Sequence, residues 1–72
     1  MKFCLYRGPN DDMKLVGAYD SVEEANAAMV HILANEGIKP YYYRVSGDLK
    51  GNQWIDYGSY SNFFEIRTKE ED

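Results

Sequence analysis

Cys4 and His31 are the side chains that could serve a nucleophilic enzyme, because a thiolate is activated by an imidazole within hydrogen-bond reach. Cys4 falls inside an expected strand and His31 on the solvent side of an expected helix, so the sheet would separate them. Each is the sole residue of its type, which leaves no zinc-type cluster and no intramolecular disulfide. The acidic pairs 11–12 and 23–24 fit a turn and a first helical turn. We therefore expect no enzyme, no metal site and no cofactor.

Aromatic side chains offer a different chemistry, that of stacking and interface formation. Three consecutive tyrosines precede Arg44, and Trp54 and Tyr57 follow after a short interval. Successive side chains of a strand point to opposite faces of its sheet, so consecutive aromatics place rings on both faces. One helix covers only one of them. We expect a binding surface on the open face, made by Tyr6, Tyr42, Arg44, Trp54 and Phe63.

The elements that must position these residues follow from local patterns. Residues rich in strand formers predict strands at 2–7, 14–19, 41–46, 53–57 and 63–67. Turn-forming residues separate the first pair at 8–12 and the later pair at 47–52. Gly17 interrupts its strand and indicates a bulge or a close approach by the helix. These signals predict an α+β domain.

The helix is the clearest element and is expected at about 22–36. Ser21 and Glu24 form a capping box, in which each side chain accepts a hydrogen bond from the backbone of the other. Gly37 supplies a left-handed C-terminal cap, and Pro40 prevents continuation. An apolar stripe at helical spacing is made by Val22, Ala25, Met29, Ile32 and Leu33.

The strand order is expected to be 14–19, 2–7, 41–46, 53–57, because every neighbour is then antiparallel. The pairing of the last short strand is left open. The residues expected to face the helix are Phe3, Leu5, Tyr41, Tyr43, Val45, Ile55, Tyr57, Phe64 and Ile66. Those expected to face away are Cys4, Tyr6, Tyr42, Arg44, Trp54, Asp56, Phe63 and Glu65, and a shift of one residue in any strand would exchange the two sets.

Length and charge limit the classes of function. The 72 residues predict one domain at 1–67, followed by a disordered acidic tail at 68–72. Neither a membrane span nor a signal peptide is visible, and the odd thiol suits a reducing compartment, so we expect a cytoplasmic protein. The net charge of −4 and the scattered basic residues argue against nucleic acid as a partner.

Three uses of the aromatic face stay open. It can be an interface for a protein partner or for a second copy, since Tyr, Trp, Phe and Arg are enriched in interface cores. It can hold a ligand, for which a glycan is favoured over a single-stranded nucleic acid because stacking on sugars needs no positive charge. It can also be cross-strand packing alone. The leading hypothesis is a non-catalytic interaction module, with a homodimer as its simplest form.

One family resemblance bears on the glycan alternative. The segment from Val16 to Ala25, the segment from Leu33 to Gly37 and the tyrosine-rich stretch after it resemble the first half of the sporulation-related repeat domain, SPOR. Residues 57–61 echo its second strand motif. That family's second helix has no counterpart here. The resemblance implies binding to peptidoglycan strands.

Overall fold

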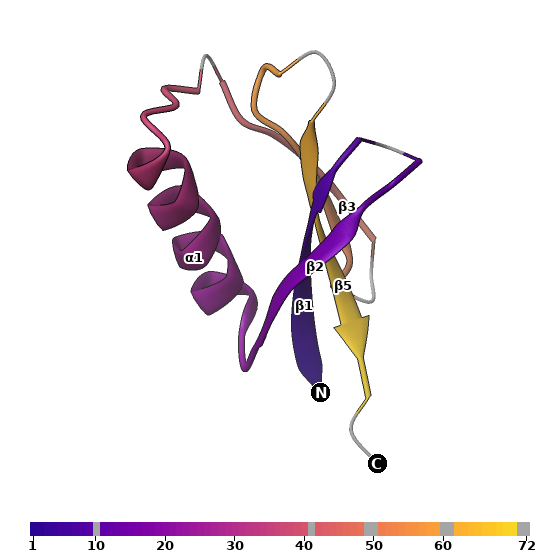
Figure 1. The fold of residues 1–72 in the computed structure, drawn as a ribbon. Helices are drawn as coiled ribbons and strands as arrows, with labels where there is room; N and C mark the ends of the chain where they lie inside the picture. Colours follow the sequence, from indigo (N-terminus) through magenta and orange to yellow (C-terminus); the bar gives the residue numbers. More distant parts are fainter. Residues whose placement is uncertain (10, 41, 49–50, 60–61, 71–72) are drawn as a thin grey trace.

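The computed structural model describes residues 1–9, 11–40, 42–48, 51–59 and 62–70. Five antiparallel strands form one open sheet, and one helix packs on one side of it (Figure 1). The elements are β1 (Lys2–Gly8), β2 (Lys14–Tyr19), α1 (Val22–Asn35), β3 (Arg44–Gly47), β4 (Gln53–Asp56) and β5 (Phe63–Lys69). The predicted α+β class and the single helix on one face are confirmed.

The strand order is β2-β1-β5-β4-β3, which corrects the expected order. The expectation placed the tyrosine-rich strand beside β1, but β5 occupies that position and pairs with both β1 and β4. β3 is instead an edge strand that pairs only with β4 among the described residues. Every neighbour is antiparallel in both orders, so strand direction alone could not separate them.

The helix ends agree closely with the sequence signals. The Ser21 side chain accepts a hydrogen bond from the Glu24 amide at 3.1 Å. The Glu24 carboxylate accepts one from the Asp20 amide, one residue earlier than a strict capping box requires. At the other end, Gly37 adopts a φ of 71°, and the Ile38 amide donates to the Leu33 carbonyl at 2.9 Å. This pattern is a Schellman motif, which satisfies the last helical carbonyls.

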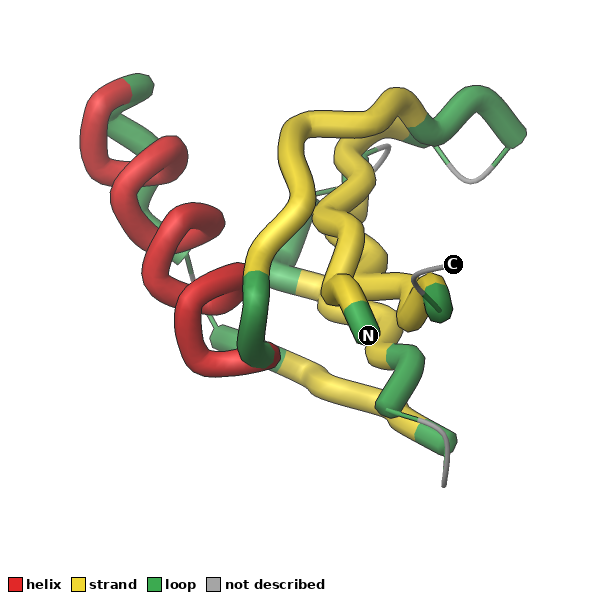
Figure 2. Tube along the Cα trace, turned by 90° about the horizontal axis from the view of Figure 1, so that it is seen from below, coloured by secondary structure: helices red, strands yellow, loops and turns green. Residues whose placement is uncertain are grey.

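The helix lies against the β2-β1-β5 side of the sheet, and Figure 2 shows the two layers from below. The core fills the space between them. Alternation predicted its sheet side correctly in β1, β4 and β5, where Leu5, Ile55, Phe64 and Ile66 are fully buried. Around them gather Ala25, Met29, Leu33 and Tyr57, with Phe3, Tyr19, Val22, Ala28, Ile32 and Ile38 packed at the margin.

Two residues that were expected to face the helix are not covered by it. Val45 lies opposite the buried Ile55, yet its side chain is 55% exposed, and Tyr43 is 47% exposed. The helix packs on β1, β2 and β5 and does not reach this far edge of the sheet. The strand also begins at Arg44 rather than at 41. Tyr41 lies outside the described residues.

The last strand is longer than predicted. β5 continues to Lys69, so residues 68 and 69 belong to the sheet and not to a tail. Residues 71 and 72 lie outside the described part. In β2, the register shift opposite Leu5 and Tyr6 leaves Val16 as an extra residue, which confirms the bulge indicated by Gly17.

Candidate functional site

The sheet face opposite the helix, called here the open face, carries a row of side chains across the strands. Pairing places Tyr6 of β1 opposite Glu65 of β5 and Glu65 opposite Trp54 of β4. Trp54 in turn lies opposite Ser46 of β3. Tyr6, Tyr42 and Trp54 were expected to form one platform on three adjacent strands, with the strand of Tyr42 in the middle. β5 lies between β1 and β4 instead, so the Glu65 carboxylate separates Tyr6 from Trp54.

Trp54 and Phe63 form the largest aromatic unit of the open face. Their ring centroids are 4.9 Å apart and the ring planes are inclined by 33°. Both side chains are half-buried, although no described element lies over this face. Aromatic pairs with this spacing add stabilisation beyond their buried area, and they leave flat apolar surface for a further contact.

Tyr6 forms a second unit with two charged neighbours from β5. The Arg67 guanidinium carbon lies 4.2 Å from the centroid of the Tyr6 ring. Its Nε donates to the Glu65 carboxylate. This hydrogen bond is the main cause that raises the pKa of Arg67 above its ordinary value. Arg67 was not among the expected site residues, although its spacing of two from Glu65 places both on one face.

Arg44 and Tyr42 form a third unit at the sheet edge. The Arg44 guanidinium carbon lies 5.1 Å from the centroid of the Tyr42 ring, and Arg44 pairs across the strands with Asp56. Both side chains of this unit are exposed. The expected site residues therefore share the open side of the sheet but fall into three groups rather than one stacking platform.

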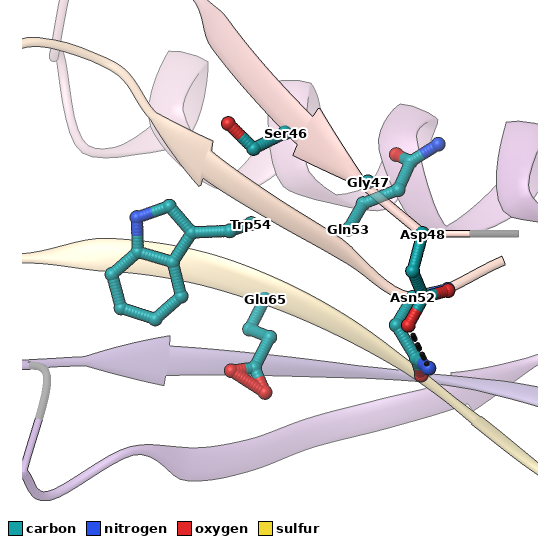
Figure 3. Close-up of a pocket in the computed structure, with 7 residues that line it drawn as sticks. All are labelled: Ser46, Gly47, Asp48, Asn52, Gln53, Trp54 and Glu65. Carbon is teal, nitrogen blue, oxygen red and sulfur yellow. Dashed lines mark hydrogen bonds between the residues drawn. The ribbon is translucent and has the colours of Figure 1, made fainter. Parts of the chain in front are cut away.

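A shallow pocket of about 250 Å³ opens beside Trp54, at the turn between β3 and β4 (Figure 3). The indole forms one wall, and the carboxylates of Asp48 and Glu65 stand at other parts of the rim. Its full lining is Ser46, Gly47, Asp48, Asn52, Gln53, Trp54 and Glu65. An aromatic wall beside carboxylates and amides can accept a cation or a polyhydroxylated ring. Residues 47–52 were expected to form a turn only.

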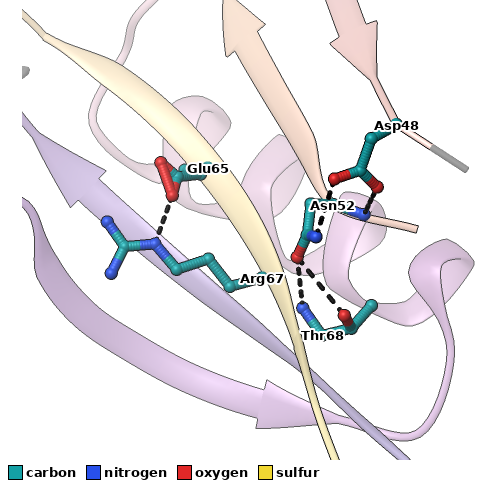
Figure 4. Close-up of polar contacts among 5 residues, drawn as sticks. All are labelled: Asp48, Asn52, Glu65, Arg67 and Thr68. Carbon is teal, nitrogen blue, oxygen red and sulfur yellow. Dashed lines mark hydrogen bonds and ion pairs between the residues drawn. The ribbon is translucent and has the colours of Figure 1, made fainter. Parts of the chain in front are cut away.

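Asn52 fixes the geometry of this pocket (Figure 4). Its backbone amide and its side-chain amide both donate to the Asp48 carboxylate, at 3.0 and 2.9 Å. Its side-chain oxygen accepts from the Thr68 amide at 2.8 Å. Asn52 thus ties the β3–β4 turn to β5, and the Asp48 carboxylate is held in place beside the pocket.

A second hollow, of about 420 Å³, lies on the helix side of the molecule. It is mainly apolar and is lined by Val30, Leu33, Ala34, Gly37, Ile38, Lys39, Pro40 and Tyr43. It lies between the C-terminal half of α1 and the residues that follow the helix, before β3 begins.

The residues considered for catalysis do not meet. Cys4 is buried on the β1 side that faces away from the helix, next to the core residue Leu5, and His31 is exposed on the helix. Across the described ranges, no three side chains of His, Cys, Asp or Glu are grouped as a metal site would require.

No protein-family model, no curated protein and no solved structure matches this chain. The resemblance to the sporulation-related repeat domain thus gains no support from the family comparison. Tyr60 and Ser61, which contributed to it, lie outside the described residues. Among the helices described, none has the length and apolar character needed to span a bilayer.

Proposed function

We propose that this protein is a non-catalytic interaction module that uses its open face to bind a protein partner or a second copy of itself. The observation that carries the proposal is the Trp54–Phe63 pair, which is stacked on the face that the helix leaves uncovered. Interface centres are enriched in Trp, Tyr and Arg, and the open face combines these types with a charged rim. The acidic balance of the chain suits a protein partner better than a polyanion.

The test is the capture of partners by the intact protein and by a Trp54→Ala variant. Trp54 lies outside the core, so the variant should keep its helical circular dichroism while it loses the captured protein or self-association. His31→Ala is the matched control, because His31 is exposed on the helix, away from the open face. If Trp54→Ala instead unfolds the domain, a milder Phe63→Leu variant distinguishes an interface from internal packing. Binding that survives both substitutions would overturn the proposal.

A ligand-binding function is the second candidate, and the pocket beside Trp54 favours it. The pocket combines an indole with the hydroxyl of Ser46 and the amide of Gln53. These groups can stack on a sugar ring and bond its hydroxyls. Because Trp54 is the sole tryptophan, its fluorescence reports directly on the pocket.

Titration of Trp54 fluorescence with glycan strands and with single-stranded oligonucleotides separates the classes of ligand. A saturable change with glycans alone would support the second candidate. No change with either at millimolar ligand would exclude this use of the pocket and leave the protein interface as the proposal.

A further inference from the structure

The two edges of the sheet differ in their readiness to pair with another strand. β2 contains the bulge at Val16, and bulges disturb the regular hydrogen-bonding edge that a new strand needs. β3 pairs with β4 in a regular register from Arg44 to Gly47. All of its residues are exposed, including the β-branched Val45. β3 is therefore the edge that can accept a further strand.

We propose that β3 pairs antiparallel with β3 of a second copy, and that Arg44 of each copy enters the Trp54 pocket of the other. The inference rests on the proposed function, since it names a second copy as the partner and the pocket on the open face as its contact. Each pocket is completed by a residue that the other chain supplies.

Symmetry limits the registers of such a pair. A two-fold axis perpendicular to the sheet keeps the open faces of both copies on one side, so each residue meets one that points the same way. A pair centred on Arg44 would place like charges directly opposite, which is destabilising. Centring on Val45 brings both exposed valines together on the helix side and places Arg44 opposite Ser46. A pair centred on Ser46 would leave each Val45 opposite Gly47, without a side-chain contact.

The Val45-centred register places Arg44 of one copy beside the Trp54 pocket of the other. Ser46 lines the pocket and lies opposite Trp54 in the same sheet. Arg44 of the second copy would stand two strand spacings, about 10 Å, from the Trp54 backbone. An extended arginine and an indole pointing to the same side can bridge that span. The guanidinium would then meet the face of the indole.

Charge complementarity favours this occupant. The carboxylates of Asp48 and Glu65 stand at two parts of the pocket rim, in a chain whose net charge is −4. Glu65 already accepts from Arg67, and a carboxylate has lone pairs for a second donor. Arg44 is exposed at the adjoining edge and is held by a ring contact to Tyr42. The interface is short, so we expect a weak dimer in the micromolar range or above.

The first experiment is cross-linking of a Val45→Cys variant under mild oxidation. Directly opposed positions of an antiparallel pair have Cβ atoms about 5 Å apart, close enough for an intermolecular disulfide after a small adjustment. Leu15→Cys is the matched control, because Leu15 is 60% exposed on the bulged β2 edge. The native Cys4 is buried and is present in both variants. A covalent dimer of Val45→Cys alone supports the proposal, and equal cross-linking of both variants overturns it.

The second experiment tests the arginine by sedimentation equilibrium. Arg44→Glu should weaken dimerisation by about tenfold or more, because it places a carboxylate against the pocket rim. Lys69→Glu makes the same change of charge at an exposed position of β5 and should leave the dimer constant nearly unchanged.

The two proposals fail in different ways. The wild-type chain could prove monomeric in the millimolar range and still capture a partner that the Trp54→Ala variant does not capture. This result would overturn the dimer and leave the interaction module intact. A dimer that tolerates Arg44→Glu as well as it tolerates Lys69→Glu overturns the arginine contact. A wild-type chain that neither associates with itself nor captures a partner would overturn both proposals.

Discussion

Arg7 and Glu36 join the sheet to the C-terminal end of the helix through a bidentate ion pair. Both guanidinium terminal nitrogens of Arg7 donate to the two oxygens of the Glu36 carboxylate. The Arg7 guanidinium carbon also lies 5.4 Å from the centroid of the buried Phe64 ring. The pair thus closes one end of the core, where the helix leaves the sheet.

This ion pair gives the fold a defined dependence on acid. The hydrogen bond from Arg7 lowers the pKa of Glu36 below its ordinary value of 4.5. Lys2 likewise lowers the pKa of Asp20. A carboxyl group whose pKa is lower in the folded chain stabilises the fold above its unfolded pKa, and this contribution is lost as the pH falls through the folded pKa.

We therefore expect the denaturation midpoint of the wild type to decrease as the pH is lowered from about 6 to about 3. Glu36→Gln should show a smaller fall, because it lacks one of the carboxyl groups that take up protons. Glu23→Gln is the control, since Glu23 is exposed in the first helical turn. Equal pH dependence in both variants would show that the Arg7–Glu36 pair does not contribute.

The N-terminal cap predicts a measurable loss on substitution of Ser21. Ser21→Ala removes the acceptor for the Glu24 amide and should cost about 1 kcal/mol of the free energy of unfolding. His31→Ala should change stability little, because His31 is exposed. Thermal melts of the two variants make the comparison. A larger loss for His31 than for Ser21 would contradict the observed helix orientation.

Asn52 should matter more than its place in a turn indicates. Asn52→Ala leaves the half-buried Thr68 amide without its acceptor, which should cost about 1–3 kcal/mol. Thr68→Val removes only the longer hydroxyl contact of 3.3 Å and should cost less. Urea denaturation followed by Trp54 fluorescence measures both. Equal losses would show that the Thr68 hydroxyl contact, and not the hydrogen bond from the Thr68 amide to Asn52, provides the stabilisation.

The rate at which a reagent modifies the Cys4 thiol reports how well neighbouring side chains cover it on the open face. Arg67 lies directly opposite Cys4 on β5, and its guanidinium lies above the neighbouring Tyr6 ring, so the arginine side chain is a cross-strand neighbour of the thiol. We expect Arg67→Ala to speed modification of Cys4 by a thiol reagent while the circular dichroism is retained. Lys69→Ala is the control, because it lies opposite Lys2, farther along the strand. Unchanged rates in Arg67→Ala would mean that backbone and neighbouring strands alone protect the thiol.

Sequence reasoning succeeded where the signal was local and failed where it depended on strand pairing. Ser21, Gly37 and the apolar stripe determined the helix, because caps and periodicity are properties of a few adjacent residues. The position of β5 depends on partners far away in the chain. Its adjacent Phe63 and Phe64 place rings on both faces, which is typical of a central strand and was available as a signal.

The candidate site shows the same division. Alternation placed Trp54, Phe63 and Tyr6 on the open side, but their grouping required the strand order. The tyrosine run was expected to form a strand from 41, whereas Tyr42 and Tyr43 precede β3 and are exposed. Aromatic content favours a strand only where a neighbouring strand and a covering layer are present, and the helix stops short of this edge.

The central place of β5 has a consequence for how the chain acquires its fold. β1 is the first and β5 the last of the described strands, yet they pair along their whole lengths, from Lys2 with Lys69 to Gly8 with Phe63. During synthesis, the edges of β1 and β4 that pair with β5 stay exposed until residue 69 has left the ribosome. A nascent or truncated chain without β5 would be prone to aggregate through those edges. Closure of so long a loop should also make folding slow for a chain of this size.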